Sequence, residues 1–349
     1  MHMDGTVIVT GATGALGQAL LKNALQRPET HTLLATTSYR ASARATQLQQ
    51  ILDSYDKGQH ASIVEVDLAD QDSIHTFASD INSKVSAGKL PPIRALVLNA
   101  AFFFERNGLK FAGRDPRTGD PFEMHFLVNY LGNFLLSLLL LESMDRKRGR
   151  IVYVSSWAHD PSRRENKRFG PDKLSWNVED LAHPVTSKLA SDVSAEAMRR
   201  YGASKLALVT FMHALQQRLT ETRDLDNIRI VGVDPGAMLH SNIAEKTSTF
   251  ERFTMVPLIQ LYTRIAQYIN PNGMFRTVEK SAEDVLRAAF ETTDPYLARD
   301  AYFDGNRPAE TAVESKDLER QKELWQLSLL YVGLEERETA LGPARCGTP

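Results

Sequence analysis

Cysteine is nearly absent from this chain of 349 residues, which contains only Cys346. Intrachain disulfides and a multi-cysteine metal site are therefore excluded, and we expect no metal. A single cysteine fits a reducing compartment, so the composition favours a cytoplasmic protein.

An excess of charge of one sign is also absent. The formal net charge is −2, whereas a nucleic-acid partner would need a strongly basic face.

Long apolar runs are missing as well. Val7–Val9 begins too early and is too short for a secretory signal, and 135–141 is far below the roughly 18 to 20 residues that cross a bilayer.

What is present is an ordinary globular composition with 42% hydrophobic and 24% charged residues. Short apolar segments alternate with amphipathic ones, which predicts an α/β fold with a parallel sheet covered by helices on both faces. We expect strands at 6–10, 32–36, 62–66, 95–98, 150–154, 228–233 and 301–303. We expect helices at 18–26, 41–55, 70–85, 122–144, 195–220, 282–290 and 315–330.

The domain organisation is predicted to be simple. Residues 1–340 form one domain with insertions at about 160–194 and 241–276, and 341–349 form a flexible tail. Residues 102–121 are polar after their first aromatics and are expected to form a loop.

Three glycines, Gly11, Gly14 and Gly17, follow the first expected strand and open the first expected helix. Thr13 and Leu16 lie between them. Such a turn lets backbone N–H groups and the helix dipole meet a pyrophosphate, and glycine permits the close approach. The position in an α/β pattern favours dinucleotide binding over a merely structural turn.

The end of the second strand indicates which dinucleotide binds. An acid there would accept the ribose hydroxyl of NAD, but the segment from Thr36 to Arg40 contains none. Ser38 and Arg40 suit a 2′-phosphate instead, so NADP(H) is favoured over NAD(H). The alternative for Arg40 is a solvated residue at a helix start.

Further cofactor contacts are expected at the ends of the next strands, because ligands gather at the carboxyl ends of parallel strands. Asp67 and Leu68 would frame the adenine. Asn99 and Ala100, with Ala101, would line the adenine ribose.

Tyr201 and Lys205 are four residues apart, so they share one face of a helix. An ammonium near a phenol favours the phenolate and lowers the pKa of the tyrosine. The pair therefore suits proton exchange with an alcohol or a carbonyl, although an ordinary amphipathic helix start would look the same.

Together these motifs resemble the short-chain dehydrogenase/reductase family in order and spacing over roughly residues 5 to 240. The resemblance implies a seven-stranded Rossmann-type, doubly wound sheet and NAD(P)(H)-linked carbonyl/alcohol chemistry. Two mild departures are Ala15 after Gly14, a spacing common in the extended branch, and Ala101 where glycine is usual. The matching residues are 10–17, 67–68, 99–101, Asn129, Ser156, Tyr201, Lys205 and 234–236.

The same resemblance implies the catalytic roles. Tyr201 would be the general acid in reduction, and Lys205 would lower its pKa and hold the nicotinamide ribose. Ser156, rather than its rival Ser155, would bind the substrate carbonyl, and Asn129 would hold a water that links Lys205 to solvent. A satisfied asparagine at a helix kink is the alternative for Asn129. Pro235 and Gly236 would face the nicotinamide.

The insertion at 160–194 is polar and basic, which favours a solvated loop over a lid for an acidic substrate. Its basic residues are Arg163, Arg164, Lys167, Arg168 and Lys173. Its part from Leu174 to Leu181 is similar to the insert of 3-ketosteroid reductases and retinol dehydrogenases, as are Tyr302–Asp304 and Leu324–Ser328. That similarity implies a bulky apolar ketone or alcohol, such as a sterol, retinoid, polyketide or terpenoid.

The apolar segment 250–269 has three interpretations. It is an apolar wall of the substrate pocket, a part of the core, or an amphipathic helix that contacts a membrane surface. Dimers and tetramers built on the long helices are common in the family, so a homo-oligomer is a further expectation, although the two insertions would oppose such packing.

The sequence thus predicts an NADPH-dependent carbonyl reductase for a large apolar small-molecule substrate. The alternative is a regulatory or assembly protein that binds NADP(H) without catalysis, since a fold does not prove an activity. An epimerase or dehydratase is a third interpretation, drawn from the Gly14 spacing.

Overall fold

The computed structural model describes residues 4–29, 31–55, 61–103, 108–163, 166, 174, 176–185, 193–238, 265, 268, 270–291, 294, 297 and 300–342.

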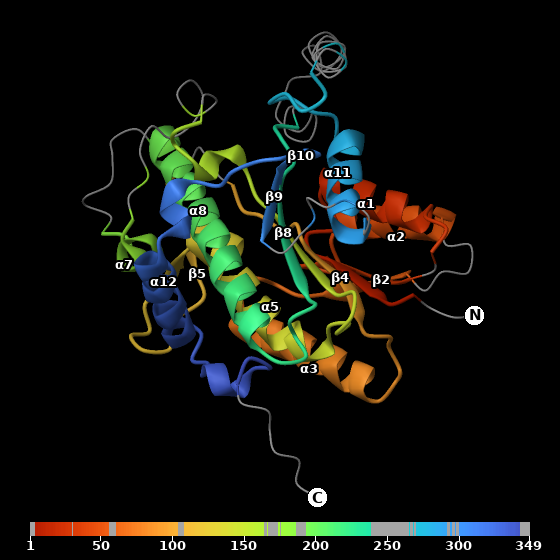
Figure 1. Cartoon of the computed structure of the whole chain (residues 1–349), viewed down its shortest axis with the longest axis horizontal. Coiled ribbons are helices and arrows are strands. Elements are labelled where there is room, and N and C mark those ends of the chain that lie inside the picture. Colours follow the sequence, from red (N-terminus) through yellow and green to blue (C-terminus); the bar gives the residue numbers. More distant parts are fainter. Residues whose placement is uncertain are drawn as a thin grey trace, which may run out of the picture.

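A mostly parallel sheet forms the centre of the protein, with the order β10-β9-β8-β7-β4-β1-β2-β3 (Figure 1). Within this sheet, each of the seven strands from β9 at one side to β3 at the other is parallel to its neighbours. Only the short edge strand β10 is antiparallel to the strand beside it. The predicted α/β doubly wound fold is confirmed, and β10 is an addition to its seven parallel strands. The strands are β1 Thr6–Val9, β2 Thr32–Thr37, β3 Ala61–Glu65, β4 Ile93–Leu98, β7 Arg150–Val154, β8 Arg229–Asp234, β9 Ala301–Asp304 and β10 Arg307–Pro308.

Helices cover both faces of the sheet, and the strands are buried on both sides as a parallel sheet requires. On one face, α1 (Ala15–Leu25), α2 (Ala43–Tyr55) and α11 (Val278–Phe290) pack on one core. On the other, α3 (Gln71–Ser86), α5 (Gly132–Leu140) and α8 (Val193–Glu221) share a second core. The helix α12 (Leu318–Tyr331) lies on the outer side of α8 (Figure 1).

The two cores follow from the alternation of side chains along each strand. Ile8, Leu96 and Ile151 point to the α3–α5–α8 side. Val9 and Val97 point to the side of α1 and α11. Neighbouring strands are in matching register, so one apolar layer forms on each face.

Residues 102–121 were expected to form a loop, and a long helix was expected to begin at Phe122. The structure instead has a small hairpin of β5 (Phe111–Ala112) and β6 (Phe122–Glu123). The helix begins at Met124, because the Glu123 carboxylate accepts a hydrogen bond from the backbone N–H of Phe126 and caps it. The start predicted at Phe122 was therefore two residues early.

The long helix is not uniform. It runs as α4 (Met124–Phe126), a π-turn (Leu127–Leu131), α5 and a final 3₁₀ turn (Leu141–Ser143). The stretch Met124–Ser143 is long and apolar enough to cross a membrane, but 83% of its most apolar window is buried inside the domain. It is the central core helix of this face.

The C-terminal part departs from the expected single helix at 315–330. A 3₁₀ turn, Val313–Lys316, comes first, and Asp317 then caps α12 by accepting hydrogen bonds from the N–H groups of Glu319 and Arg320. Of the tail predicted at 341–349, residues 343–349 lie outside the described chain.

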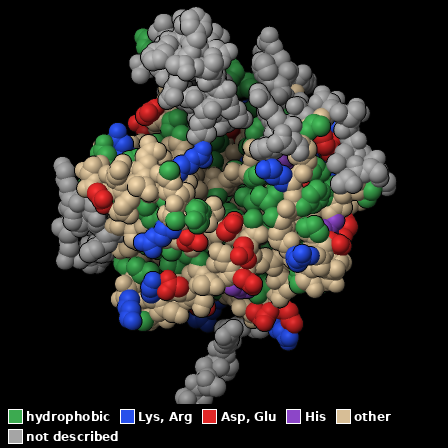
Figure 2. Space-filling model, turned by 180° about the vertical axis from the view of Figure 1, so that it is seen from behind, with side chains coloured by type: hydrophobic (Ala, Val, Ile, Leu, Met, Phe, Trp, Pro, Cys, Tyr) green, Lys and Arg blue, Asp and Glu red, His purple; other side chains and the backbone are tan. Residues whose placement is uncertain are grey.

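The two predicted insertions are only partly described. In the first, α7 (Val178–Ala182) buries Val178 and Leu181 against the domain. Most of the second, including nearly all of the apolar segment 250–269, lies outside the described residues. On the rear face in Figure 2, basic and acidic side chains are interspersed, in keeping with the small net charge.

Candidate active site

The glycine loop between β1 and α1 has the backbone that its sequence predicts. Gly11 has a φ of 63°, and a Cβ there would lie 2.8 Å from the Cα of Ala100. A Cβ on Gly17 would lie 2.5 Å from the carbonyl oxygen of Gly11. Gly14, the N-cap of α1, is exposed and supplies no capping side chain. The first N–H groups of α1 thus suit the pyrophosphate of a dinucleotide.

The end of β4 supports this loop. The Asn99 side chain donates hydrogen bonds to the carbonyl oxygens of Thr10 at 2.9 Å and Gly11 at 3.2 Å. The Thr10 hydroxyl accepts from the backbone N–H groups of Asn99 and Ala100. Asn99 therefore positions the phosphate loop, a role beyond the ribose contact expected from the sequence.

The turn after β2 holds the residues predicted to recognise a 2′-phosphate. Ser38 and Arg40 are both exposed. The backbone N–H of Arg40 donates to the Glu65 carboxylate at 2.9 Å. Sequence reasoning missed Glu65, because it searched for an acid only after the second strand and this one ends the third.

The residues at the end of β3 divide into two roles. Asp67 is half-buried, and its carboxylate accepts from the N–H of Ala69 at 2.9 Å. The Leu68 side chain lies in the core beside Gly132, where a Cβ would come within 2.4 Å of the Leu68 carbonyl oxygen. Only the backbone of Leu68 is placed to border a cofactor.

At the end of β8, Gly236 takes a φ of 73° and donates its N–H to the Asp234 carboxylate at 2.9 Å. Pro235 is tied to α11, because the Ser281 hydroxyl donates to its carbonyl oxygen at 2.7 Å. The loop predicted to face the nicotinamide is thus fixed from two sides.

The predicted catalytic residues come together at the end of β7. Ser156 follows β7, and its hydroxyl caps the 3₁₀ turn Trp157–His159. Lys205 of α8 is buried, and its ammonium donates to the Val154 carbonyl oxygen at 3.0 Å. The same Nζ lies 5.8 Å from the centre of the Tyr201 ring.

The electrostatics of this cluster differ from the simple expectation. Burial raises the pKa of Tyr201 to about 12, against the effect of a hydrogen bond with Ser156. Burial also lowers the pKa of Lys205 to about 8, against the nearby negative charge of Asp234. The lowering expected for the tyrosine is therefore not found in the protein alone, because desolvation of the phenolate outweighs the hydrogen bond with Ser156. The phenol therefore carries its proton at neutral pH, although the raised pKa of Tyr201 makes it a weaker acid than a free tyrosine.

Asn129 lies in the π-turn, a feature that is frequent at functional sites. Its side-chain oxygen accepts from the N–H of Phe102 at 2.6 Å, and its nitrogen donates to the Phe102 carbonyl and to the Ser204 hydroxyl, each at 3.0 Å. Asn129 thus joins the end of β4 to α8 beside Tyr201. The water expected at this residue remains a prediction.

An ionic network underlies the site at the ends of β8 and β9. Arg163 binds Asp234 at 3.3 Å and Asp304 at 2.7 Å. Arg276, buried at 1% exposure, pairs with Asp304 and donates to the Asp234 carbonyl oxygen. The solvated-loop interpretation was therefore wrong for Arg163, because two carboxylates at strand ends hold it. The other basic residues of that run lie outside the described chain.

Two histidines near the site gave no recognisable motif. His159 is fully buried and binds the Ser156 carbonyl oxygen through Nδ1 at 2.7 Å. His125 pairs with Glu123 through Nδ1 at 2.6 Å, and both side chains are buried. For His125, the only signal available in the sequence was a polar side chain at the otherwise apolar start of a helix.

Comparisons with known proteins agree with this geometry. A family model described as short chain dehydrogenase matches residues 5–166. The chain is 36% identical over 370 residues to "Short-chain dehydrogenase iccH" of Talaromyces variabilis, covering 98% of this chain and 99% of that protein. It is 27% identical to human retinol dehydrogenase 13, covering 95% and 85% of the two chains.

Solved structures share the fold at low sequence identity. An NADPH-bound carbonyl reductase from chicken fatty liver is 14% identical, covers 89% of this chain and 96% of its own, and gives a TM-score of 0.57. A short chain dehydrogenase from Burkholderia cenocepacia in complex with NADP is 16% identical, covers 82% and 91%, and gives a TM-score of 0.51.

Proposed function

The chain belongs to the short-chain dehydrogenase family, and from this premise we propose that it is an NADPH-dependent carbonyl reductase for a bulky apolar ketone. Its relatives are oxidoreductases that act on small molecules. The observation that carries the proposal is what lies together at one end of the central sheet. That end holds both the uncapped glycine turn of α1 and the cluster of half-buried Tyr201 with buried Lys205 and Ser156.

These residues have complementary tasks in the reduction. A bound nicotinamide supplies a hydride to the carbonyl carbon. Tyr201 donates its proton to the carbonyl oxygen, so the product is an alcohol, and Ser156 holds that oxygen by a hydrogen bond. Lys205, anchored on Val154, holds the nicotinamide ribose and supplies positive charge beside the phenol. Asn129 fixes the segment between β4 and α8 that borders the reacting groups.

Replacement of Tyr201 tests the mechanism. Tyr201→Phe keeps the ring that packs on Phe103 and removes the proton donor. We expect turnover of a ketone panel to fall by about 10²–10⁴-fold or more, with NADPH binding retained. The readouts are NADPH absorbance for turnover and NADPH fluorescence for binding. Retained turnover would refute the role of the phenol, whereas NADPH binding by wild type with no turnover across the panel would favour the non-catalytic alternative.

The cofactor preference rests on the turn after β2 and on the structures of relatives that hold NADP or NADPH. Ser38 and Arg40, both exposed, would bind the 2′-phosphate, while Glu65 holds the backbone of the turn. Arg40→Ala should weaken NADPH binding about 10-fold or more, since hydrogen bonds to charged groups contribute about 1.5–3 kcal/mol. The control is NADH, whose affinity should not change. Tighter binding of NADH than NADPH by wild type would overturn the preference.

The apolar substrate is supported by the names of relatives. One is the human retinol dehydrogenase above, and another is a zebrafish polyprenol dehydrogenase, 27% identical over 94% of this chain. Both names refer to large apolar alcohols. Sterol, retinoid, polyketide and terpenoid ketones are the classes to assay first.

A further inference from the structure

One nitrogen of a buried imidazole next to the catalytic tyrosine is unused. His125 is 2% exposed, and its Nδ1 lies 2.6 Å from a carboxylate oxygen of Glu123. Its Nε2 is fully buried and meets no hydrogen-bond partner within the described part of the chain. An unsatisfied buried polar atom costs about 1–3 kcal/mol, so such an atom in a native structure calls for an explanation.

The Glu123 side chain fixes which nitrogen is unused. This carboxylate is 1% exposed, and its second oxygen accepts from the backbone N–H of Phe126 at 3.1 Å. An ionised carboxylate only accepts hydrogen bonds, so Nδ1 of His125 carries the proton that joins the two side chains. The ring cannot turn over without breaking this bond, and Nε2 is therefore held in one direction.

The imidazole lies close to the reacting groups. The edges of Phe102 and Phe103 face it, with ring centres at 5.1 Å and 6.5 Å. Phe103 in turn contacts the Tyr201 ring, centre to centre at 5.1 Å. His125 also precedes Asn129 by one helical turn, and Asn129 binds the backbone of Phe102. The Phe103 ring is thus a common neighbour of the imidazole and of the Tyr201 ring.

Phe103 is a cover that is only partly packed. Its side chain is 38% exposed, whereas the imidazole behind it is almost fully buried. Access of a substrate to Nε2 would therefore require the partly exposed Phe103 ring to rotate away from the imidazole.

We propose that His125 binds a hydroxyl group of the substrate through Nε2, with Glu123 as its positioning residue. The substrate is then a bulky ketone with a second oxygen function, rather than a plain hydrocarbon ketone. A hydroxyl fits because it donates to a neutral imidazole and accepts from a protonated one. This inference rests on the proposed function and adds the substrate's second polar group.

A purely structural Glu123–His125 pair is the competing explanation. It would make both side chains matter for folding and neither for the choice of substrate. The two explanations differ in how substrates are ranked, a quantity that does not depend on how much active enzyme a variant yields.

The test compares trans-1-decalone with a set of decalones that carry one hydroxyl at successive ring positions. With wild type and NADPH, one hydroxylated isomer should have a kcat/KM about 10-fold above that of the parent, since its hydrogen bond satisfies a buried nitrogen that otherwise has no partner within the described part of the chain. A preference below 2-fold at every position would overturn the proposal, and this part needs no variant.

Two matched variants then assign the preference to one nitrogen. In His125→Gln the amide nitrogen takes the place of Nε2, and in His125→Asn it takes the place of Nδ1. Gln should keep most of the preference for the hydroxylated isomer, whereas Asn should abolish it. Equal preferences in the two variants would refute the role of Nε2. Met124→Leu, at the neighbouring position, is the control and should leave the ranking unchanged.

The outcomes separate this inference from the proposed function. If wild type binds NADPH and reduces none of the decalones or the ketone panel, the proposed function fails. If wild type reduces decalones but ranks them without regard to the hydroxyl, only the role of His125 fails.

Discussion

At the scale of single residues, the buried His159 side chain positions the segment that carries Ser156. Its Nδ1 donates to the Ser156 carbonyl oxygen at 2.7 Å, and its Nε2 accepts from the N–H of Ala312 at 3.3 Å. The bond accepted by Nε2 exists only in the neutral ring, and burial lowers the pKa of His159 to about 4. The segment that carries Ser156 is thus tied to the chain that leads to α12.

The first stability prediction follows from this pKa. In the unfolded chain His159 takes up a proton near its ordinary pKa of 6.5, but in the folded protein only near about 4. Stability is therefore fully present above pH 6.5 and is lost as the pH falls towards 4, by roughly 3 kcal/mol over that range. Urea unfolding at pH 7 and pH 4.5 should show a smaller difference for His159→Gln than for wild type.

The comparison of the two proteins is essential, because Asp234 titrates in the same window with the opposite sign. Burial raises the pKa of Asp234 to about 6, so its contribution to stability grows as the pH falls. That contribution is common to wild type and His159→Gln. An equal pH dependence in the two proteins would contradict the role assigned to His159.

The position of the candidate site in the fold was largely predictable, because its motifs depend on short spacing. Gly11, Gly17 and the Tyr201–Lys205 pair each need only one turn of chain, which a sequence shows directly. Long-range effects were not visible. The raised pKa of Tyr201 depends on burial by many elements, and the pairing of Arg163 with Asp304 joins residues far apart in the chain. His125 escaped notice because its partner Glu123 lies in a strand that the sequence did not predict.

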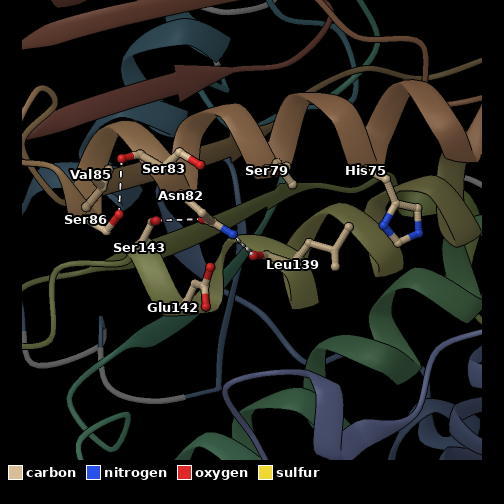
Figure 3. Close-up of a pocket in the computed structure, with 10 residues that line it drawn as sticks. His75, Ser79, Asn82, Ser83, Val85, Ser86, Leu139, Glu142 and Ser143 are labelled. Carbon is tan, nitrogen blue, oxygen red and sulfur yellow. Dashed lines mark hydrogen bonds between the residues drawn. The ribbon is translucent and has the colours of Figure 1, made fainter. Parts of the chain in front are cut away.

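At the scale of elements, α3 and the end of α5 are joined by one asparagine. Asn82 of α3 donates to the Leu139 carbonyl oxygen at 2.8 Å and accepts from the Ser143 hydroxyl at 2.6 Å (Figure 3). These bonds satisfy the last turn of the core helix where it tightens to 3₁₀ geometry. They lie in a cavity of about 490 Å³ lined mainly by the two helices, away from the catalytic residues.

Removal of this link should destabilise the protein without touching the active site. Asn82→Ala leaves the Leu139 carbonyl and the Ser143 hydroxyl without their partner, so we expect a loss of about 1–3 kcal/mol. Ser86→Ala on the same helix is the matched control, because the exposed Ser86 hydroxyl bonds only the carbonyl of Ser83 within this cavity, and its loss should stay within about 0.5 kcal/mol. Equal midpoints of urea unfolding for the two variants would refute the link.

Element types were easier to predict than element limits. All seven parallel strands were predicted from short apolar runs, and Asp70 was correctly assigned as the cap of α3. The hairpin of β5 and β6 was missed because two-residue strands carry no periodic signal. The break before α12 was missed although Asp317, a residue typical of helix N-caps, stands there.

At the scale of the whole molecule, the C-terminal helix completes the core on one face. Trp325 of α12 is 2% exposed and packs against Phe134 of α5 and Phe211 of α8, with ring centres at 5.5 Å and 5.8 Å. The Arg218 guanidinium lies 3.7 Å above its ring, and its indole N–H donates to Glu336. The outer side of α8 is thus covered by the chain itself, and a homo-oligomer built on that side would need α12 to move.

The domain should therefore depend on α12 for its stability. Trp325→Ala removes a large buried ring, and we expect a loss of about 3–5 kcal/mol. Leu330→Ala on the same helix is the control, since Leu330 is 53% exposed and its replacement should change stability by about 0.5 kcal/mol or less. Thermal unfolding measures both. If the Trp325→Ala protein unfolds at the same temperature as wild type, α12 does not contribute to the stability of the domain.

The place of β1 between β2 and β4 has a consequence for synthesis on the ribosome. β1 is made before either neighbour, and chains grow at roughly 5–20 residues per second. The glycine loop gains its support from Asn99 only once β4 has emerged, whereas Tyr201 and Lys205 follow about a hundred residues later. Each nascent chain thus contains the proposed pyrophosphate site before it contains the proposed proton donor, and Lys205, Pro235 and Gly236 complete the proposed cofactor site last.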